Sequence, residues 1–132
     1  MSTTAITLLD ALRAHLSTFD LPAPWSVNLT LYSGGPNVSL QIVRREVPEV
    51  ASALLAWAES LTDVTAEAWR TPEGDSLHLS ITGHLPAGVS LRVYGYLPFT
   101  ACGLSADLAP NTATTLPLHT LRHLTTPGEA TL

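Results

Sequence analysis

Apolar and polar residues alternate from residue 76 to residue 97, on both sides of a short loop PAG at positions 86–88. Successive side chains of a strand point to opposite faces, so this period of two predicts two antiparallel strands joined by a hairpin. Gly88 favours the left-handed residue that ends a three-residue loop. The register gathers apolar residues on one face and pairs polar residues on the other: His78 with Tyr96, Ser80 with Tyr94, Thr82 with Arg92, and His84 with Ser90.

A second alternating segment, residues 25–43, predicts another hairpin with one buried and one solvated face. A turn centred on Gly34 and Gly35 brings apolar residues opposite one another and polar residues opposite one another. The predicted apolar pairs are Leu31 with Val38, Leu29 with Leu40, and Val27 with Ile42.

Three segments carry apolar residues at helical spacing: residues 4–18, 47–61 and 117–124. The second is apolar around most of its circumference, which favours burial between a sheet and another element. The first places its apolar residues in a single stripe: Ala5, Leu8, Leu9, Leu12 and Leu16, continued by Phe19.

Residues 63–85 predict two further strands around the turn TPEGD. One consistent register places Ala66 beside Leu79 and Glu67 opposite His78. Between Pro98 and residue 115 the pattern is weak, and we expect an irregular connection that leaves room for one short strand. The predicted fold is therefore α+β: helix, hairpin, helix, three-stranded meander and short C-terminal helix, with a mostly antiparallel five-stranded sheet and helices packed on one face.

Composition limits the organisation and location of the chain. At 132 residues we expect one domain over residues 1–125 and a flexible tail over 126–132. No segment approaches the length of a membrane span, residues 1–16 lack a basic leader, and Cys102 is the single cysteine, so we expect a cytoplasmic protein. All six basic residues are arginines, which is typical of a GC-rich genome and excludes lysine-dependent chemistry.

Hydrophobic residues make up 45% of the chain and charged residues 13%, with a mean hydropathy of +0.24. So little charge indicates that a second copy or another protein covers some apolar surface. The net charge of −5 argues against nonspecific nucleic-acid binding, which depends on neutralising phosphates.

The polar face of the meander carries the best cluster of candidate residues. A carboxylate at Glu67 beside His78 would orient the imidazole and raise its basicity, and Tyr96 could position a ligand. The same face also suits a partner protein, or only solvent, because aromatic and charged cross-strand pairs stabilise exposed sheets. Single-stranded nucleic acid stacking on its aromatic rings is a weaker alternative, given the scarcity of basic residues. The candidate interaction residues are Trp57, Trp69, Arg92, Tyr94, Tyr96 and His84.

Two other features suggest weaker candidates. His119 and His123 are four apart, a spacing at which a helix presents two metal ligands, but two ligands do not complete a site. Trp57 is predicted on the outer flank of its helix, where tryptophan is a common interface anchor. No cofactor-binding motif is present, so we expect no cofactor.

The pattern HLSITGHLPAGVSLRVYGYL, followed by the leucine-rich segment LPLHTLRHL, resembles small uncharacterised proteins of actinobacteria and of their phages or mobile elements. This resemblance implies a cytoplasmic accessory protein and supplies no catalytic residues. Our first hypothesis is a non-enzymatic interaction or adaptor module that forms a homodimer or binds another protein. The alternative is a small-ligand-binding protein or minor enzyme built around His78, which a concave surface at that residue would favour.

Overall fold

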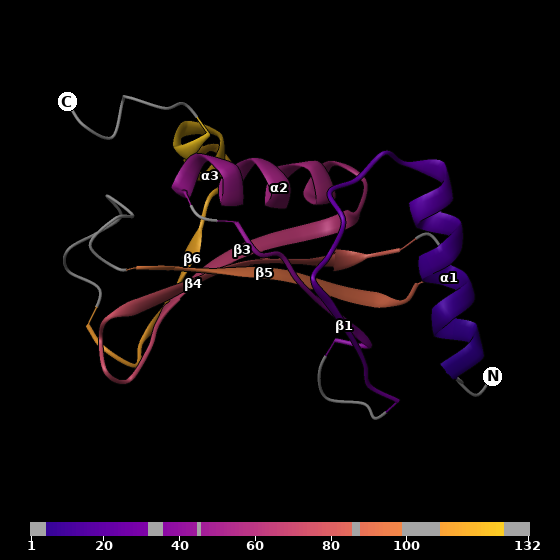
Figure 1. Cartoon of the computed structure of the whole chain (residues 1–132), viewed down its shortest axis with the longest axis horizontal. Helices are drawn as coiled ribbons and strands as arrows, with labels where there is room; N and C mark the ends of the chain where they lie inside the picture. The colour runs from indigo at the N-terminus through magenta and orange to yellow at the C-terminus, as the bar shows by residue number, and fades with distance from the viewer. Residues whose placement is uncertain (1–4, 32–35, 45, 86–87, 99–108, 126–132) are drawn as a thin grey trace.

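The computed structural model describes residues 5–31, 36–44, 46–85, 88–98 and 109–125. Within these residues the chain forms three helices and one six-stranded sheet, which confirms the α+β class (Figure 1). The predicted tail 126–132 and Cys102 lie outside the described residues. In chain order the elements are α1 (Ala5–Thr18), β1 (Ser26–Leu29), β2 (Val38–Gln41), α2 (Val47–Glu59), β3 (Thr62–Arg70), β4 (Ser76–His84), β5 (Ser90–Pro98), β6 (Ala113–Leu116) and α3 (Leu118–Leu124).

The strands lie in the order β1-β2-β5-β4-β3-β6. Within the described residues every neighbouring pair is antiparallel except β2 and β5, which run parallel. Between β2 and β5 the chain passes through α2 and the β3–β4 hairpin, and a parallel pair requires a long connection of this kind. The first hairpin therefore joins the meander in one continuous sheet.

The sixth strand, β6, extends the predicted five-stranded sheet along the free side of β3. Its sequence ATTL is mostly exposed, so it lacks the alternation of a half-buried strand. Only pairing with β3 makes it a strand. The weak pattern before residue 115 allowed a short strand here, but it did not indicate which strand would be its partner.

The predicted register of the β4–β5 hairpin is confirmed at every pair. Leu85 and Val89 close the loop with a hydrogen bond of 2.9 Å from the Leu85 amide to the Val89 carbonyl. Gly88 has a φ of +83°, the left-handed conformation that the loop requires. The turn residue and the alternation thus agree on a single register.

The predicted registers of the other two hairpins are wrong by two residues. Leu29 lies opposite Val38 rather than Leu40, and His78 lies opposite Trp69 rather than Glu67. In the β3–β4 hairpin, the Thr71 amide donates to the Ser76 carbonyl at 3.0 Å. The turn between the two strands therefore lies further along the chain than predicted. Because side chains repeat every two residues, a shift of two changes the cross-strand partners but leaves each side chain on its predicted face.

Helix α2 lies over the inner face of the sheet and contacts β3, β4 and β5, while α3 packs beside it (Figure 1). Eight of its side chains are buried, as its nearly continuous apolar surface predicted. In α3, Leu121 and Leu124 face inward. The core lies between these helices and the strands.

Trp57 is completely buried, and its indole Nε1–H donates to the Pro22 carbonyl at 3.0 Å. The prediction that it lies on an outer flank of α2 is therefore wrong. The flank is covered because His15 of α1 stacks beside the indole, with ring centroids 6.0 Å apart, and the segment after α1 passes over it. Trp57 is not available for a contact with a second copy in this conformation.

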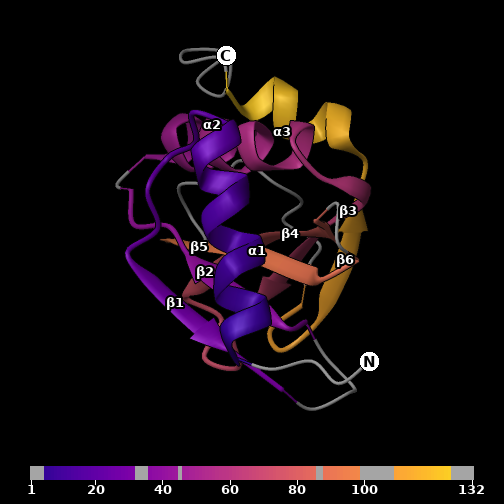
Figure 2. The same ribbon diagram turned by 90° about the vertical axis from the view of Figure 1, so that its right-hand side faces the viewer.

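Helix α1 stands beside the end of the sheet and runs across both layers rather than joining α2 and α3 on the inner face (Figure 2). The prediction of helices packed on one face is thus correct for two of the three described helices. Because α1 touches the core along a narrow line, only Leu8, Leu12 and His15 are buried. The rest of its predicted apolar stripe, including Leu9 and Phe19, stays exposed.

His15 joins α1 to the end of α2. Its Nε2 lies 2.8 Å from the Ser60 hydroxyl, which itself donates to the Trp57 carbonyl at 2.7 Å, so Nε2 is the donor to Ser60. Its Nδ1 is buried and has no hydrogen-bond partner among the described residues. Burial lowers the pKa of His15, because the charged imidazolium would lose its hydration. No helix in the described residues is long and apolar enough to cross a bilayer.

The buried His15 predicts a loss of stability in mild acid. An unfolded His15 binds a proton more readily than the folded one, so its contribution to stability is complete above about pH 6.5 and falls as the pH drops through the lower folded pKa. His15→Phe should flatten the decrease in the free energy of unfolding between about pH 7 and pH 5, measured by urea denaturation. His119→Gln, at an exposed position, is the control. Equal slopes in His15→Phe and the native chain would contradict the prediction.

Candidate functional site

The candidate site lies on the outer face of the sheet, on the side opposite α2 and α3 (Figure 1). None of the described helices packs on this face. Alternation along each strand brings polar and aromatic side chains to it, and the cross-strand registers align them in rows. One row contains Trp69, His78 and Tyr96, and the next contains Glu67, Ser80 and Tyr94.

Four rings form a continuous cluster on this face. Trp69 and His78 meet edge to face with centroids 4.8 Å apart, and His78 meets Tyr96 in the same way at 4.0 Å. Tyr94 contacts Tyr96 edge to face at 5.7 Å. Such contacts hold the rings in fixed orientations while Trp69, His78 and Tyr94 remain half-buried and Tyr96 is exposed.

One charge of each sign borders the cluster. The Arg92 guanidinium lies over the Tyr94 ring, 5.3 Å from its centroid, as expected for a cation–π contact. Glu67 lies opposite Ser80, so the predicted pairing of its carboxylate with His78 is wrong. The residue opposite His78 on β3 is Trp69, because the β3–β4 loop closes between Thr71 and Ser76.

The face is hollowed around these residues. A concavity of about 440 Å³ is lined by the four rings with Arg92, Glu67, Asn28 and Ser39. A second concavity of about 330 Å³ adjoins it, shares Glu67 and Arg92, and reaches Thr115 on β6. Small residues such as Ser80 and Thr82 line this second part. Together the two concavities form a groove that crosses the strands, and we call it the outer-face groove.

The surroundings of His78 and Tyr96 favour the neutral form of each side chain. Burial lowers the pKa of His78, and the nearby positive charge of Arg92 lowers it further. Burial raises the pKa of Tyr96, with additional contributions from its neighbour Tyr94. The lowered pKa of His78 is opposite to the increased basicity that a neighbouring carboxylate would give. The residue opposite His78 on β3 is Trp69 rather than Glu67.

Asn28 and Ser39 were not identified from the sequence as site residues. They reach the outer-face groove because β2 pairs with β5, placing Ser39 beside Arg92, and β1 pairs with β2, placing Asn28 beside Ser39. Their alternation with buried residues did predict that they face outward. Nothing in the local pattern indicated that the first hairpin would lie next to β5.

The remaining predicted residues lie elsewhere. His84 is exposed at the end of β4, outside the groove lining, and Trp57 is in the core. His119 and His123 are both exposed on α3. Within the described part of the chain, no group of three or more His, Cys, Asp or Glu side chains could hold a metal ion.

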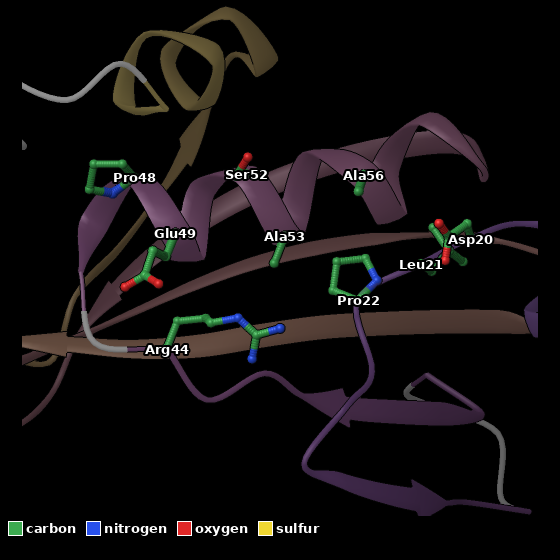
Figure 3. A pocket seen from close by; sticks show the side chains of 9 residues that line it. All are labelled: Asp20, Leu21, Pro22, Arg44, Pro48, Glu49, Ser52, Ala53 and Ala56. Atoms are coloured by element: carbon green, nitrogen blue, oxygen red, sulfur yellow. The ribbon is translucent and has the colours of Figure 1, made fainter.

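A larger concavity, of about 620 Å³, lies on the other side of the molecule along α2 (Figure 3). Small side chains such as Ser52 and Ala53 line its helical wall. Its charged groups are separated, with Glu49 and Arg44 at one end and Asp20 at the other. Convergent polar groups mark a binding site better than volume does, so the outer-face groove is the stronger candidate.

No protein-family model, curated protein sequence or solved structure matches this chain.

The environment of His78 predicts a measurable change when Arg92 is neutralised. In Arg92→Gln the imidazolium no longer faces a positive charge, so the pKa of His78 should rise while staying below its ordinary value, because burial remains the larger cause. The pKa is measured by following the imidazole proton resonances against pH by NMR. Arg44→Gln, on the α2 side, is the matched control, and an unchanged or lower pKa in Arg92→Gln would refute the assignment.

Proposed function

We propose that this protein is a non-enzymatic binding module that recognises its ligand or partner in the outer-face groove. The single observation that carries the proposal is the cluster of Trp69, His78, Tyr94 and Tyr96, joined to Arg92 around a concavity on the uncovered side of the sheet. Aromatic residues and arginine dominate the energetics of protein recognition. Their fixed orientations limit the entropy lost on binding.

The arrangement favours binding over catalysis. A general base must have an orienting partner and a pKa near the working pH. His78 has no carboxylate opposite it to orient the imidazole, because its cross-strand neighbours are Tyr96 and Trp69, and burial lowers its pKa. The Glu67 carboxylate is exposed and lies opposite Ser80. These features suit contact with a neutral or weakly charged ligand.

The proposal predicts that binding depends on Tyr94. A thermal-shift screen of peptides, oligosaccharides and nucleosides should find a ligand that, at about 100 times its Kd, stabilises the folded protein by about 2.7 kcal/mol and raises the Tm by several degrees. Tyr94→Ala should abolish the shift. His119→Ala removes an exposed ring on α3, outside the groove, and should retain it. Hits that stabilise both variants alike, or no hits in any class, would contradict the proposal.

A second candidate function is self-association, which the exposed apolar surface around β1 favours. Trp25 is 75% exposed and Val27 46% exposed, although Val27 shares the apolar face of the sheet with buried Leu40. β1 is an edge strand, and Figure 2 shows it on the same side of the molecule as α1, which carries further exposed apolar residues. An uncovered apolar edge strand is a template for pairing with a second copy. The exposed apolar residues are Ile6, Leu9, Leu16, Phe19, Trp25, Val27 and Leu31.

This second proposal predicts that a charge on the β1 edge reduces assembly. We expect the native chain to form dimers in sedimentation-velocity runs at about 100 μM, and Val27→Glu to shift it toward monomer by burying an unpaired carboxylate in the contact. Thr65→Glu, on a distant exposed strand position, is the matched control. A native chain that stays monomeric at this concentration would remove self-association from consideration.

A further inference from the structure

We infer that the outer-face groove takes a proline-rich peptide segment in the polyproline II conformation. This inference rests on the proposed function and specifies the chemistry of the ligand. Three properties of the groove support it: the relative orientation of its rings, the hydrogen-bond donors on its walls, and its length across the sheet.

The rings form ridges rather than a flat platform. Trp69 is perpendicular to His78, His78 lies at 74° to Tyr96, and Tyr94 lies at 76° to Tyr96. Rings turned against one another in this way leave notches between them, and pyrrolidine rings of a polyproline II segment dock into aromatic-lined grooves.

A planar ligand fits these rings poorly. The one nearly parallel pair, His78 and Tyr94, has an interplanar angle of 12° and a centroid separation of 6.3 Å. A flat ring inserted between them needs about 7 Å, twice the optimal carbon–carbon contact distance. A base or nucleoside therefore does not fit between these two rings unless the side chains move apart.

The groove presents hydrogen-bond donors to a ligand. The Trp69 indole N–H and the Asn28 side-chain amide make no hydrogen bond to another described residue, and the Arg92 guanidinium stacks on Tyr94. A polyproline II segment presents backbone carbonyls that have no internal partner, and proline contributes no N–H. The carbonyls of such a segment are therefore suited to accept hydrogen bonds from these donors.

The charge of the groove favours a peptide over a polyanion. Arg92 is the one arginine among the described residues that line it, and the Glu67 carboxylate lies in the same concavities. A phosphate-bearing strand would meet a single positive charge and one negative charge, whereas a neutral proline-rich segment meets no repulsion.

The length of the groove sets the length of the segment. Its lining extends from Asn28 on β1 to Thr115 on β6, which is five strand spacings, or about 24 Å. At a rise of about 3.1 Å per residue, about eight residues of polyproline II cover this distance.

The test is an NMR titration of the ¹⁵N-labelled protein with a peptide of about nine prolines, compared with a Gly-Ser peptide of equal length. We expect the proline peptide to bind with a Kd on the order of 100 μM and to shift the Trp69 indole resonance and the amides of Tyr94 and Tyr96. The Gly-Ser peptide should leave them unchanged, because a flexible chain loses more entropy on binding.

Variants identify the contacts. Tyr94→Ala should weaken proline-peptide binding about tenfold, and Trp69→Phe, which keeps an aromatic side chain but is smaller and lacks the N–H, about threefold. His119→Ala, at an exposed position on α3 outside the groove, should bind like the native chain. Equal affinities for native, Tyr94→Ala and Trp69→Phe proteins would overturn the inference.

Two outcomes separate this inference from the proposed function. If an oligosaccharide or a single-stranded oligonucleotide shifts the Trp69, Tyr94 and Tyr96 resonances while the proline peptide does not, the ligand class is wrong and the binding function stands. If proline peptide, oligosaccharide and oligonucleotide all leave these resonances unchanged, both the ligand class and the proposed function are overturned.

Discussion

The packing of α2 on the inner face of the sheet is the contact on which the rest of the structure depends. It is possible at such close range because Gly95 faces the helix: a Cβ there would lie 3.0 Å from Val50 Cγ1 and 3.3 Å from the Ile42 carbonyl. Gly83 has the same role near the end of α2, where a Cβ would lie 2.9 Å from Leu61 Cβ. This packing removes apolar side chains of α2 and of the strands from water, and such removal is the main stabilising term in folding.

This contact also determines which face of the sheet can bind a ligand. Since α2 and α3 occupy the inner face, the polar positions of the central strands face outward, where no helix among the described residues packs on them. The connection through α2 returns the chain so that β5 lies beside β2, and the outer-face groove then receives residues from both halves of the sheet. The position of the proposed binding surface therefore follows from the packing of α2 and α3 on the opposite face of the sheet.

The exposed apolar residues of α1 and β1 have a related origin. Helix α1 lies across the side of the helix layer and the sheet. It covers Trp57, but most of its own apolar stripe remains exposed to solvent. β1 lies at the edge of the sheet, and Val27 on its apolar face remains exposed to solvent. The same arrangement therefore yields a polar aromatic groove on one side and an apolar edge on another, which suit different kinds of contact.

The sequence by itself determined the three helices, five of the six described strands with the faces of their residues, and the register of the β4–β5 hairpin, because alternation and Gly88 are local signals that agree. It therefore placed His78, Tyr94 and Tyr96 together correctly. Tertiary structure decided the rest. The strand partner of β6 and the parallel pairing of β2 with β5 depend on contacts between distant segments, and so does the burial of Trp57 under α1. The Glu67–His78 pairing was wrong because a two-residue shift preserves faces, so a pattern of faces cannot distinguish one register from the next.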